Sequence, residues 1–194
     1  GDFNPIHVDT IQARKTHAGQ AIVHGIHLAL WALDVSKAKL SFGDKIIIEF
    51  QSQVNLNMDV NIKWDDLNNI ITLNNSHGLK YCSIEIQSSG IMAKAKPKNN
   101  PVVFRKTCML PADLKIQDVK LNTKLFDLCG GAEPSLGYDL FPYLAQSVGL
   151  DFVYEIACLS SIIGMKIPGK HSLFSGLCLC LSPSKEKKKH IGNR

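Results

Sequence analysis

Small and apolar residues between positions 21 and 33 recur at the spacing of one helix face. They are Ala21, Ile22, Gly25, Leu28, Ala29, Ala32 and Leu33, and Ile26 and Trp31 widen the apolar surface almost all the way around. A helix that is apolar on nearly every side is one that other elements enclose. The pattern therefore predicts a first stretch, residues 1–39, made of a loop and one enclosed helix.

Strand-like runs follow at residues 46–50, continuing to 54, and then at 60–64, 70–73 and 81–86. Polar sequences at 65–69 and 74–78 separate these runs and are typical of turns. Consecutive strands joined by short turns pair in an antiparallel sheet, because parallel neighbours need long crossover connections. The runs therefore predict an antiparallel meander, and together with the helix they indicate an α+β fold.

The second half of the chain is less regular. Residues 88–134 show no sustained period, and we interpret them as a connection with a few short elements. An apolar helical run then covers 138–163 with an interruption at Gly149, and a Pro-Gly turn follows at 167–170. The alternating run at 172–182 predicts one strand, on which Cys178 and Cys180 share a face.

Length and composition indicate a globular protein of one large or two small domains, with 194 residues of which 45% are apolar. No apolar run approaches the roughly 18 residues that span a bilayer, so we expect no membrane insertion. No initiator Met and no charged-then-apolar leader are visible, which predicts no secretory signal. The six cysteines lack a C-x-x-C spacing, and we expect reduced thiols in the cytoplasm or another reducing compartment. Cys178 and Cys180 lack nearby metal partners in the sequence, so packing is the preferred interpretation.

The first nine residues, Gly-Asp-Phe-Asn-Pro-Ile-His-Val-Asp, hold an acid and a histidine five positions apart. Pro5 fixes its own φ and biases Asn4 away from the helical region, which favours a bent loop over a first helical turn. A bend there can bring Asp2 and His7 to face one small volume. Such a pair can polarise one water, the acid orienting it and the imidazole moving its proton. The structural alternative is that Asp2 and Asn4 cap a turn and that His7 lies at the surface.

Gly25 opens the apolar helix, where a glycine costs about 1 kcal/mol relative to alanine and needs a reason. One reason is the close approach of a ligand carbonyl to a bare backbone N–H near the helix N-terminus. Close packing against a strand is the other, and both stay open. We interpret His24 as a helix-start residue without chemistry, and His17, His27 and His77 as structural or solvent-facing.

The complete opening string resembles the MaoC-like dehydratases, which include the (R)-specific enoyl-CoA hydratases. Their pattern Gly-Asp-x-Asn-Pro-[Leu/Ile]-His-x-[Asp/Ser] is matched at every fixed position. The close resemblance covers about residues 1–34, with a looser one through the strands that follow. It implies a hotdog fold, in which an antiparallel sheet wraps around a long central helix. It also implies that Asp2 and His7 are the catalytic pair, and that the backbone N–H of Gly25, with Asn4, serves the thioester oxygen and substrate.

The reaction that the resemblance implies is hydration of trans-2-enoyl thioesters to (R)-3-hydroxyacyl thioesters and the reverse dehydration, in fatty-acid or related acyl metabolism. The partner would be an acyl-CoA or acyl-carrier-protein thioester, with no metal or organic cofactor. No phosphate loop, zinc spacing or nucleophile elbow is present in the sequence. The alternative function is a non-catalytic acyl-thioester-binding or scaffold module of a multidomain acyl-processing enzyme. A thioesterase shares the hotdog fold, but nothing in the motif favours it.

The family places a helix and a strand before this motif, whereas nothing precedes Gly1 here. We therefore predict a catalytic hotdog unit at 1–87 without its leading elements, a connection at 88–134, the start of a second, motif-free unit at 135–182 and a basic tail at 183–194. This describes a double hotdog with an incomplete second unit, and both ends look cut. The full-length parent would be a homodimer or a double hotdog.

The net charge of +5 is mild and gathers in the tail and in the connection. Without aromatic interleaving or a nucleic-acid motif, it predicts no nucleic-acid partner, and we interpret the tail as solvated. For the lysines at 94–98, two interpretations stay open. They belong to a solvated linker, or they attract the phosphates of an acyl-CoA or a carrier-protein arm.

Overall fold

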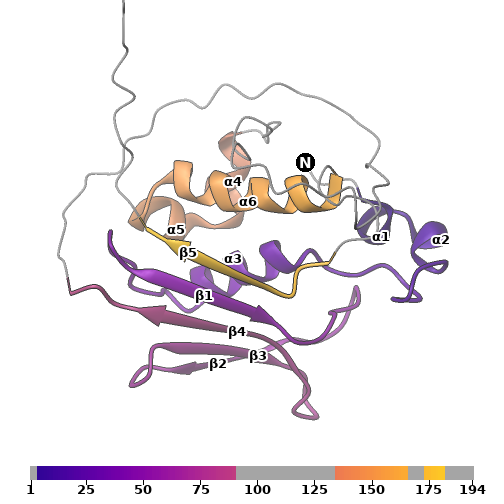
Figure 1. Cartoon of the computed structure of the whole chain (residues 1–194), viewed down its shortest axis with the longest axis horizontal. Coiled ribbons are helices and arrows are strands. Elements are labelled where there is room, and N and C mark those ends of the chain that lie inside the picture. Colours follow the sequence, from indigo (N-terminus) through magenta and orange to yellow (C-terminus); the bar gives the residue numbers. More distant parts are fainter. Residues whose placement is uncertain (1–3, 91–133, 166–172, 182–194) are drawn as a thin grey trace, which may run out of the picture.

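The chain forms an α+β fold built on one antiparallel sheet. The computed structural model describes residues 4–90, 134–165 and 173–181 (Figure 1). Its five-stranded sheet has the order β2-β3-β4-β1-β5, and all neighbouring strands run antiparallel. The strands are β1 (Lys45–Phe50), β2 (Asn61–Asp65), β3 (Ile70–Asn74), β4 (Lys80–Gln87) and β5 (Gly176–Cys180). The predicted strand runs and the α+β class are thus confirmed.

The end of β1 differs from the prediction that this strand continues to residue 54. The backbone N–H groups of Gln51 and Ser52 both donate to the carbonyl oxygen of Tyr81, at 2.9 and 3.3 Å. Two successive residues thus share one acceptor, so the one-to-one pairing of β1 with β4 is lost and the strand ends there. Beyond it, Asn55 forms an isolated antiparallel bridge with Ile22. Residues 51–54 leave the sheet and become part of a cavity wall.

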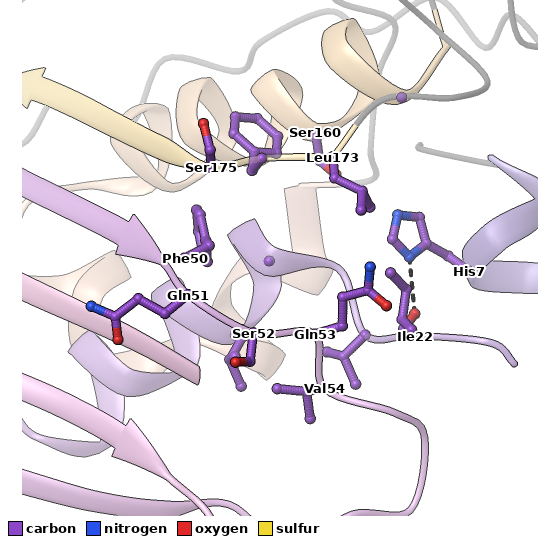
Figure 2. A pocket seen from close by; sticks show the side chains of 15 residues that line it. His7, Ile22, Phe50, Gln51, Ser52, Gln53, Val54, Ser160, Leu173 and Ser175 are labelled. Atoms are coloured by element: carbon purple, nitrogen blue, oxygen red, sulfur yellow. Dashed lines mark hydrogen bonds between the residues drawn. The ribbon is translucent and has the colours of Figure 1, made fainter. Parts of the chain in front are cut away.

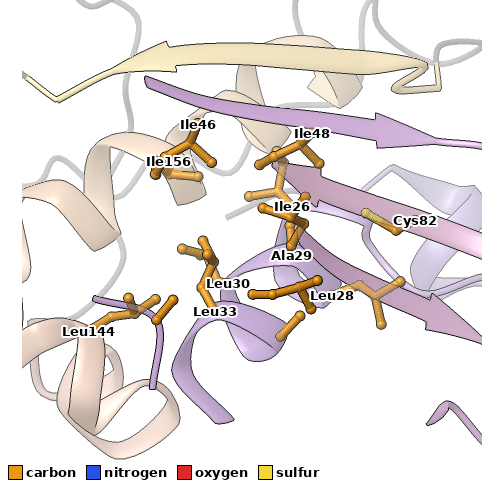
Figure 3. Packing of buried hydrophobic residues seen from close by; sticks show 14 of the residues in the cluster. Ile26, Leu28, Ala29, Leu30, Leu33, Ile46, Ile48, Cys82, Leu144 and Ile156 are labelled. Atoms are coloured by element: carbon orange, nitrogen blue, oxygen red, sulfur yellow. The ribbon is translucent and has the colours of Figure 1, made fainter. Parts of the chain in front are cut away.

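Helix α3 (Gly25–Val35) packs on the sheet face where the side chains of alternate strand residues point inward. Figure 3 shows this layer, in which Ile48 of β1 lies close to Ile26 and Ala29 of the helix, and Ile46 lies beside Ile156. Leu144 and Ile156, from helices that follow later in the chain, belong to the same buried cluster. The helix is therefore covered by the sheet and by later helices, as its apolar circumference requires. The wrapping of the sheet around α3 in the hotdog manner stays a prediction.

The C-terminal helical run is divided into three helices, α4 (Pro134–Leu140), α5 (Pro142–Ser147) and α6 (Leu150–Met165). The predicted interruption at Gly149 is confirmed, since its φ of +94° lies in the left-handed region that favours glycine. A second break at Phe141 was not predicted. Pro142 occupies the first turn of α5, where the missing N–H costs nothing, and it cannot continue the preceding helix.

The C-terminal strand joins the sheet of the N-terminal half. β5 pairs with β1 over five residues, from Lys45 opposite Cys180 to Glu49 opposite Gly176. Cys178 and Cys180 share one face of β5, as predicted, but both are exposed, so the interpretation that they serve packing is wrong. The connection at 88–134, apart from its first residues and Pro134, lies outside the described residues, as do the 167–170 turn and the 183–194 tail. The division into two hotdog units stays a prediction.

The motif segment is helical where the sequence predicted a bent loop, and that prediction is wrong. Residues Pro5–Val8 form one helical turn, α1, and Thr10–Ala13 form a second, α2. Asn4 is extended, with ψ of 127°, as the residue before a proline should be. However, an extended residue followed by proline is also the ordinary start of a helix, with Asn at the N-cap and Pro in the first turn. Within the described ranges, no helix is long and apolar enough to cross a membrane.

Candidate active site

His7 lies on α1 and is fixed by the chain that leads into α3. Its Nδ1 is 2.9 Å from the carbonyl oxygen of Ile22 (Figure 2). A carbonyl oxygen only accepts hydrogen bonds, so Nδ1 must carry the proton and donate it. The neutral ring then has its lone pair on Nε2, which is the tautomer a general base needs. The backbone supports the same contact, because the N–H of Ile22 donates to the carbonyl oxygen of Ile6 at 3.1 Å.

A second histidine ring covers the first. The imidazole rings of His7 and His24 are stacked, with centroids 3.8 Å apart and an interplanar angle of 27°. His24 is the N-cap residue of α3, so its ring connects His7 with the start of that helix. The interpretation of His24 as a helix-start residue is correct for its backbone. The stacking of its side chain on His7 could not be predicted from the sequence separation of the two residues.

Gly25 is the first residue of α3, and its backbone N–H points out of the helix. The carbonyl oxygen of His24 accepts a hydrogen bond from the N–H of Leu28 at 3.0 Å, so that carbonyl points along the helix. In a trans peptide the N–H is antiparallel to the carbonyl, which directs the N–H of Gly25 the opposite way. It belongs to the first helical residues, whose N–H groups have no intrahelical acceptor. The helix dipole adds partial positive charge at this end.

The space at Gly25 is also tight. A Cβ atom added there would lie 3.0 Å from Cε1 of Phe50 and 3.3 Å from its Cδ1. Packing against β1 therefore supplies one reason for glycine, as the structural alternative expected. The other explanation, that a ligand carbonyl approaches the backbone N–H of Gly25, stays open, because Gly25 and Phe50 both line the same cavity.

The cavity measures about 250 Å³ and is built from both halves of the chain (Figure 2). His7 lies at one end, and Phe50 and Ser175 lie at the other. Its lining consists of His7, Ile22, Val23, Gly25, Leu28, residues 50–54, Ser160, Gly164 and residues 173–175. Among these described residues, His7 is the single ionisable side chain.

The C-terminal contribution to the cavity was not foreseen from the sequence. Ser160 and Gly164 come from α6, and Phe174 precedes β5, with its ring 6.0 Å from that of Phe50. Ser160 is buried, at 9% exposure. Serine and glycine within an apolar helix carry no spacing signal of their own, so only the folded chain identifies them. The motif-free segment thus supplies a wall of the site that holds His7.

Asn4, which the resemblance places with Gly25 at the thioester oxygen and substrate, makes structural contacts in the described part of the chain, and its role toward substrate stays a prediction. Its side chain is almost fully buried, and its Nδ2 donates to the carbonyl oxygen of Gly164 at 3.1 Å. Its Oδ1 accepts from the N–H of Ile6 at 3.2 Å. Asn4 is not among the described residues that line the cavity. It caps α1 and ties the motif to the last turn of α6, whose carbonyl groups need partners.

Asp2, the predicted partner of His7, lies outside the described residues, so its pairing with His7 stays a prediction. The other three described histidines have different surroundings. Nε2 of His17 is 2.8 Å from Nε2 of Gln53, a cavity residue, and His77 is exposed on a turn. His27 rests edge-on against Phe141 with ring centroids 5.2 Å apart, and partial burial lowers its pKa.

The described residues contain no group of three metal-binding side chains. Cys82 lies in the core, and burial raises the pKa of its thiol to about 12, so it is a packing residue and not a nucleophile. Cys158 is buried as well. Cys108 and Cys129 lie outside the described residues.

Neither a protein-family profile nor a curated protein sequence matches this chain. Among solved structures, the chain is similar to an (R)-hydratase from A. caviae involved in PHA biosynthesis. The two sequences are 22% identical, the matched part covers 44% of this chain and 74% of the hydratase, and the TM-score is 0.29. At that similarity, function has to be argued from the site itself.

Proposed function

We propose that the protein hydrates short trans-2-enoyl thioesters to (R)-3-hydroxyacyl thioesters and catalyses the reverse dehydration. The observation that carries the proposal is the pairing of two groups on one small cavity. His7 is held as the Nδ1–H tautomer by Ile22, and Gly25, whose N–H points out of its helix, lines the same cavity. The first is suited to moving a proton, and the second to stabilising an oxyanion.

In hydration, Nε2 of His7 removes a proton from a water molecule as the water oxygen bonds to the β-carbon. Electron density moves through the double bond to the thioester oxygen, which becomes an enolate. The N–H of Gly25 donates a hydrogen bond to that oxygen, and its donation strengthens as the charge develops. His7 then gives the proton on its Nε2 to the α-carbon, which completes the addition of one water, restores the thioester carbonyl and returns the ring to its neutral form.

In this proposal Asp2 orients the attacking water, which is the role that the opening motif implies for it. Its carboxylate accepts a hydrogen bond from the attacking water and orients the oxygen lone pair toward the β-carbon. The (R) configuration follows from the resemblance of the opening motif to MaoC-like dehydratases. So does the finer fold assignment, a motif-bearing hotdog unit followed by the start of a second one.

The cavity favours a short acyl group. Pockets for drug-sized ligands measure about 300–1,000 Å³, and this cavity, at about 250 Å³, is smaller. The rings of Phe50 and Phe174, with centroids 6.0 Å apart, both line it, and Phe50 lies at the end away from His7. A crotonyl group fits this size class better than a long-chain enoyl group.

The test is to mix the 194-residue protein with crotonyl-CoA and follow the enoyl-thioester absorbance band. We expect the band to decay and chiral analysis of the product to give the (R)-3-hydroxy isomer. Binding of crotonyl-CoA without decay of the band would instead support an acyl-thioester-binding module. The proposal would be overturned if the protein showed no binding and no turnover of crotonyl-CoA, or if the product were the (S) isomer.

A further inference from the structure

The stacked rings of His7 and His24 connect two parts of the site that lie 17 positions apart in the sequence. His7 comes from α1 and His24 from the N-cap of α3. Ile22 joins the two segments, since its carbonyl oxygen accepts from His7 and its N–H donates to Ile6. The stack therefore lies where backbone and side-chain hydrogen bonds of Ile22 already hold the two segments together.

The hydrogen bond from Nδ1 to Ile22 fixes one edge of the His7 ring but not its tilt. An imidazole held at one nitrogen can still rock about that bond, which displaces Nε2 at the opposite edge. A flat ring at a centroid distance of 3.8 Å blocks rocking toward that side. The orientation of Nε2 thus depends on two contacts, the carbonyl of Ile22 and the face of His24.

The backbone of His24 fixes the second catalytic group. Its carbonyl accepts from the N–H of Leu28 at 3.0 Å, and the same peptide unit carries the N–H of Gly25. The side chain of His24 therefore touches the base, and its backbone sets the direction of the oxyanion donor. We infer that His24 is a positioning residue that holds the Nε2 atom of His7 at a fixed place relative to the N–H of Gly25. This inference rests on the proposed hydration.

Substitutions that separate ring shape from chemistry test the inference. His24→Ala removes the flat face, whereas His24→Phe keeps it and removes both nitrogens. Because small misplacements of a reacting group can cost about 10²-fold, we expect His24→Ala to lower kcat by at least about 10-fold with little change in KM. His24→Phe should retain at least about a third of kcat, since the stacking surface remains. His27→Ala, which removes a ring from the same helix outside the described cavity lining, is the matched control.

A spectroscopic measurement separates this inference from the proposed function. In the wild-type protein, ¹⁵N-edited NMR of the His7 imidazole should show a single Nδ1–H tautomer. In His24→Ala the His7 ring signals should broaden as the ring takes up several tilts about the bond to Ile22, and in His24→Phe they should stay sharp. An inactive wild type with this NMR pattern would reject the hydration but keep the positioning. An active wild type with unchanged kcat and unchanged His7 signals in His24→Ala would reject the positioning alone. If His24→Ala does not fold, His24→Leu replaces it, and equal kcat in His24→Leu and His24→Phe would also overturn the inference.

Discussion

The carboxylate of Asp34 caps a helix that lies far from it in the sequence. Its Oδ1 accepts a hydrogen bond from the backbone N–H of Leu144 at 2.9 Å, across a separation of 110 residues. Phe141, the N-cap residue of α5, makes no side-chain capping bond of its own. The carboxylate sits near the end of α3, where the dipole of that helix disfavours it, and at the start of α5, where the dipole favours it. The contact ties the N-terminal half to the C-terminal helices.

Replacing Asp34 with alanine should destabilise the whole fold. The change removes a helix cap and leaves a buried N–H without its acceptor, and together these cost about 1–3 kcal/mol. Asp34→Asn keeps an acceptor oxygen and should lose less. Urea unfolding followed by far-UV circular dichroism measures both effects. A free energy of unfolding for Asp34→Ala equal to that of the wild type would contradict the capping role.

The strands and α3 could be predicted because their signals are local. Strand-like apolar runs marked β1 and β4, and the turns at 65–69 and 74–78 separated the runs. Those patterns depend on the period of each element alone. The predicted continuation to residue 54 failed because the backbone of Gln51 and Ser52 bonds to Tyr81, which is a partner on another strand.

The site was predictable only as a set of residue types. The motif identified His7, and the glycine at the helix start identified Gly25, but their environment depends on partners far away in the sequence. The wall formed by Ser160 and the contact of Asn4 with Gly164 arise when α6 packs against the first segment. The stacking of His24 on His7 joins two parts of that first segment that lie 17 positions apart. No periodicity in the sequence encodes such contacts.

His7→Gln should reduce hydration by at least about 100-fold, the lower range for the loss of general acid–base help. Glutamine can still donate to the carbonyl of Ile22, so the segment should remain folded, but its amide cannot accept a proton at neutral pH. The measurement is kcat with crotonyl-CoA at saturation. His77→Gln, at an exposed turn, is the matched control and should behave as wild type. Near-normal turnover by His7→Gln would remove the catalytic assignment.

Asp2→Asn should cause a loss of similar size if Asp2 and His7 act on the same water. Groups that act as a unit show strongly non-additive effects, so the double variant Asp2→Asn/His7→Gln should be little worse than either single variant. Comparing kcat for the four proteins measures this coupling. Losses that simply multiply would show that the two residues act independently.

His27 should give the protein a pH-dependent stability. Contact with Phe141 desolvates part of the ring, although much of the side chain stays exposed, and this lowers its pKa from the ordinary value of 6.5. As the pH falls through 6.5, the unfolded chain binds a proton before the folded chain does, so stability is lost toward the folded-state pKa. When the pH is lowered from about 7.5 to about 5, the melting temperature of His27→Gln minus that of wild type should therefore increase. A difference that is constant with pH would contradict this prediction.

Gly25→Ala should abolish most of the activity, and a second substitution can reveal the reason. The added methyl would meet the ring of Phe50 at 3.0 Å and would also stand beside the N–H that is proposed to hold the thioester oxygen. Phe50→Leu makes room for the methyl without changing the N–H. If ligand approach demands the glycine, Gly25→Ala/Phe50→Leu should recover melting temperature but stay at least about 10-fold below Phe50→Leu in kcat, because loss of one oxyanion donor costs about 10²–10³-fold. Recovery of both stability and kcat would show that packing against Phe50 is the whole reason for glycine at this position.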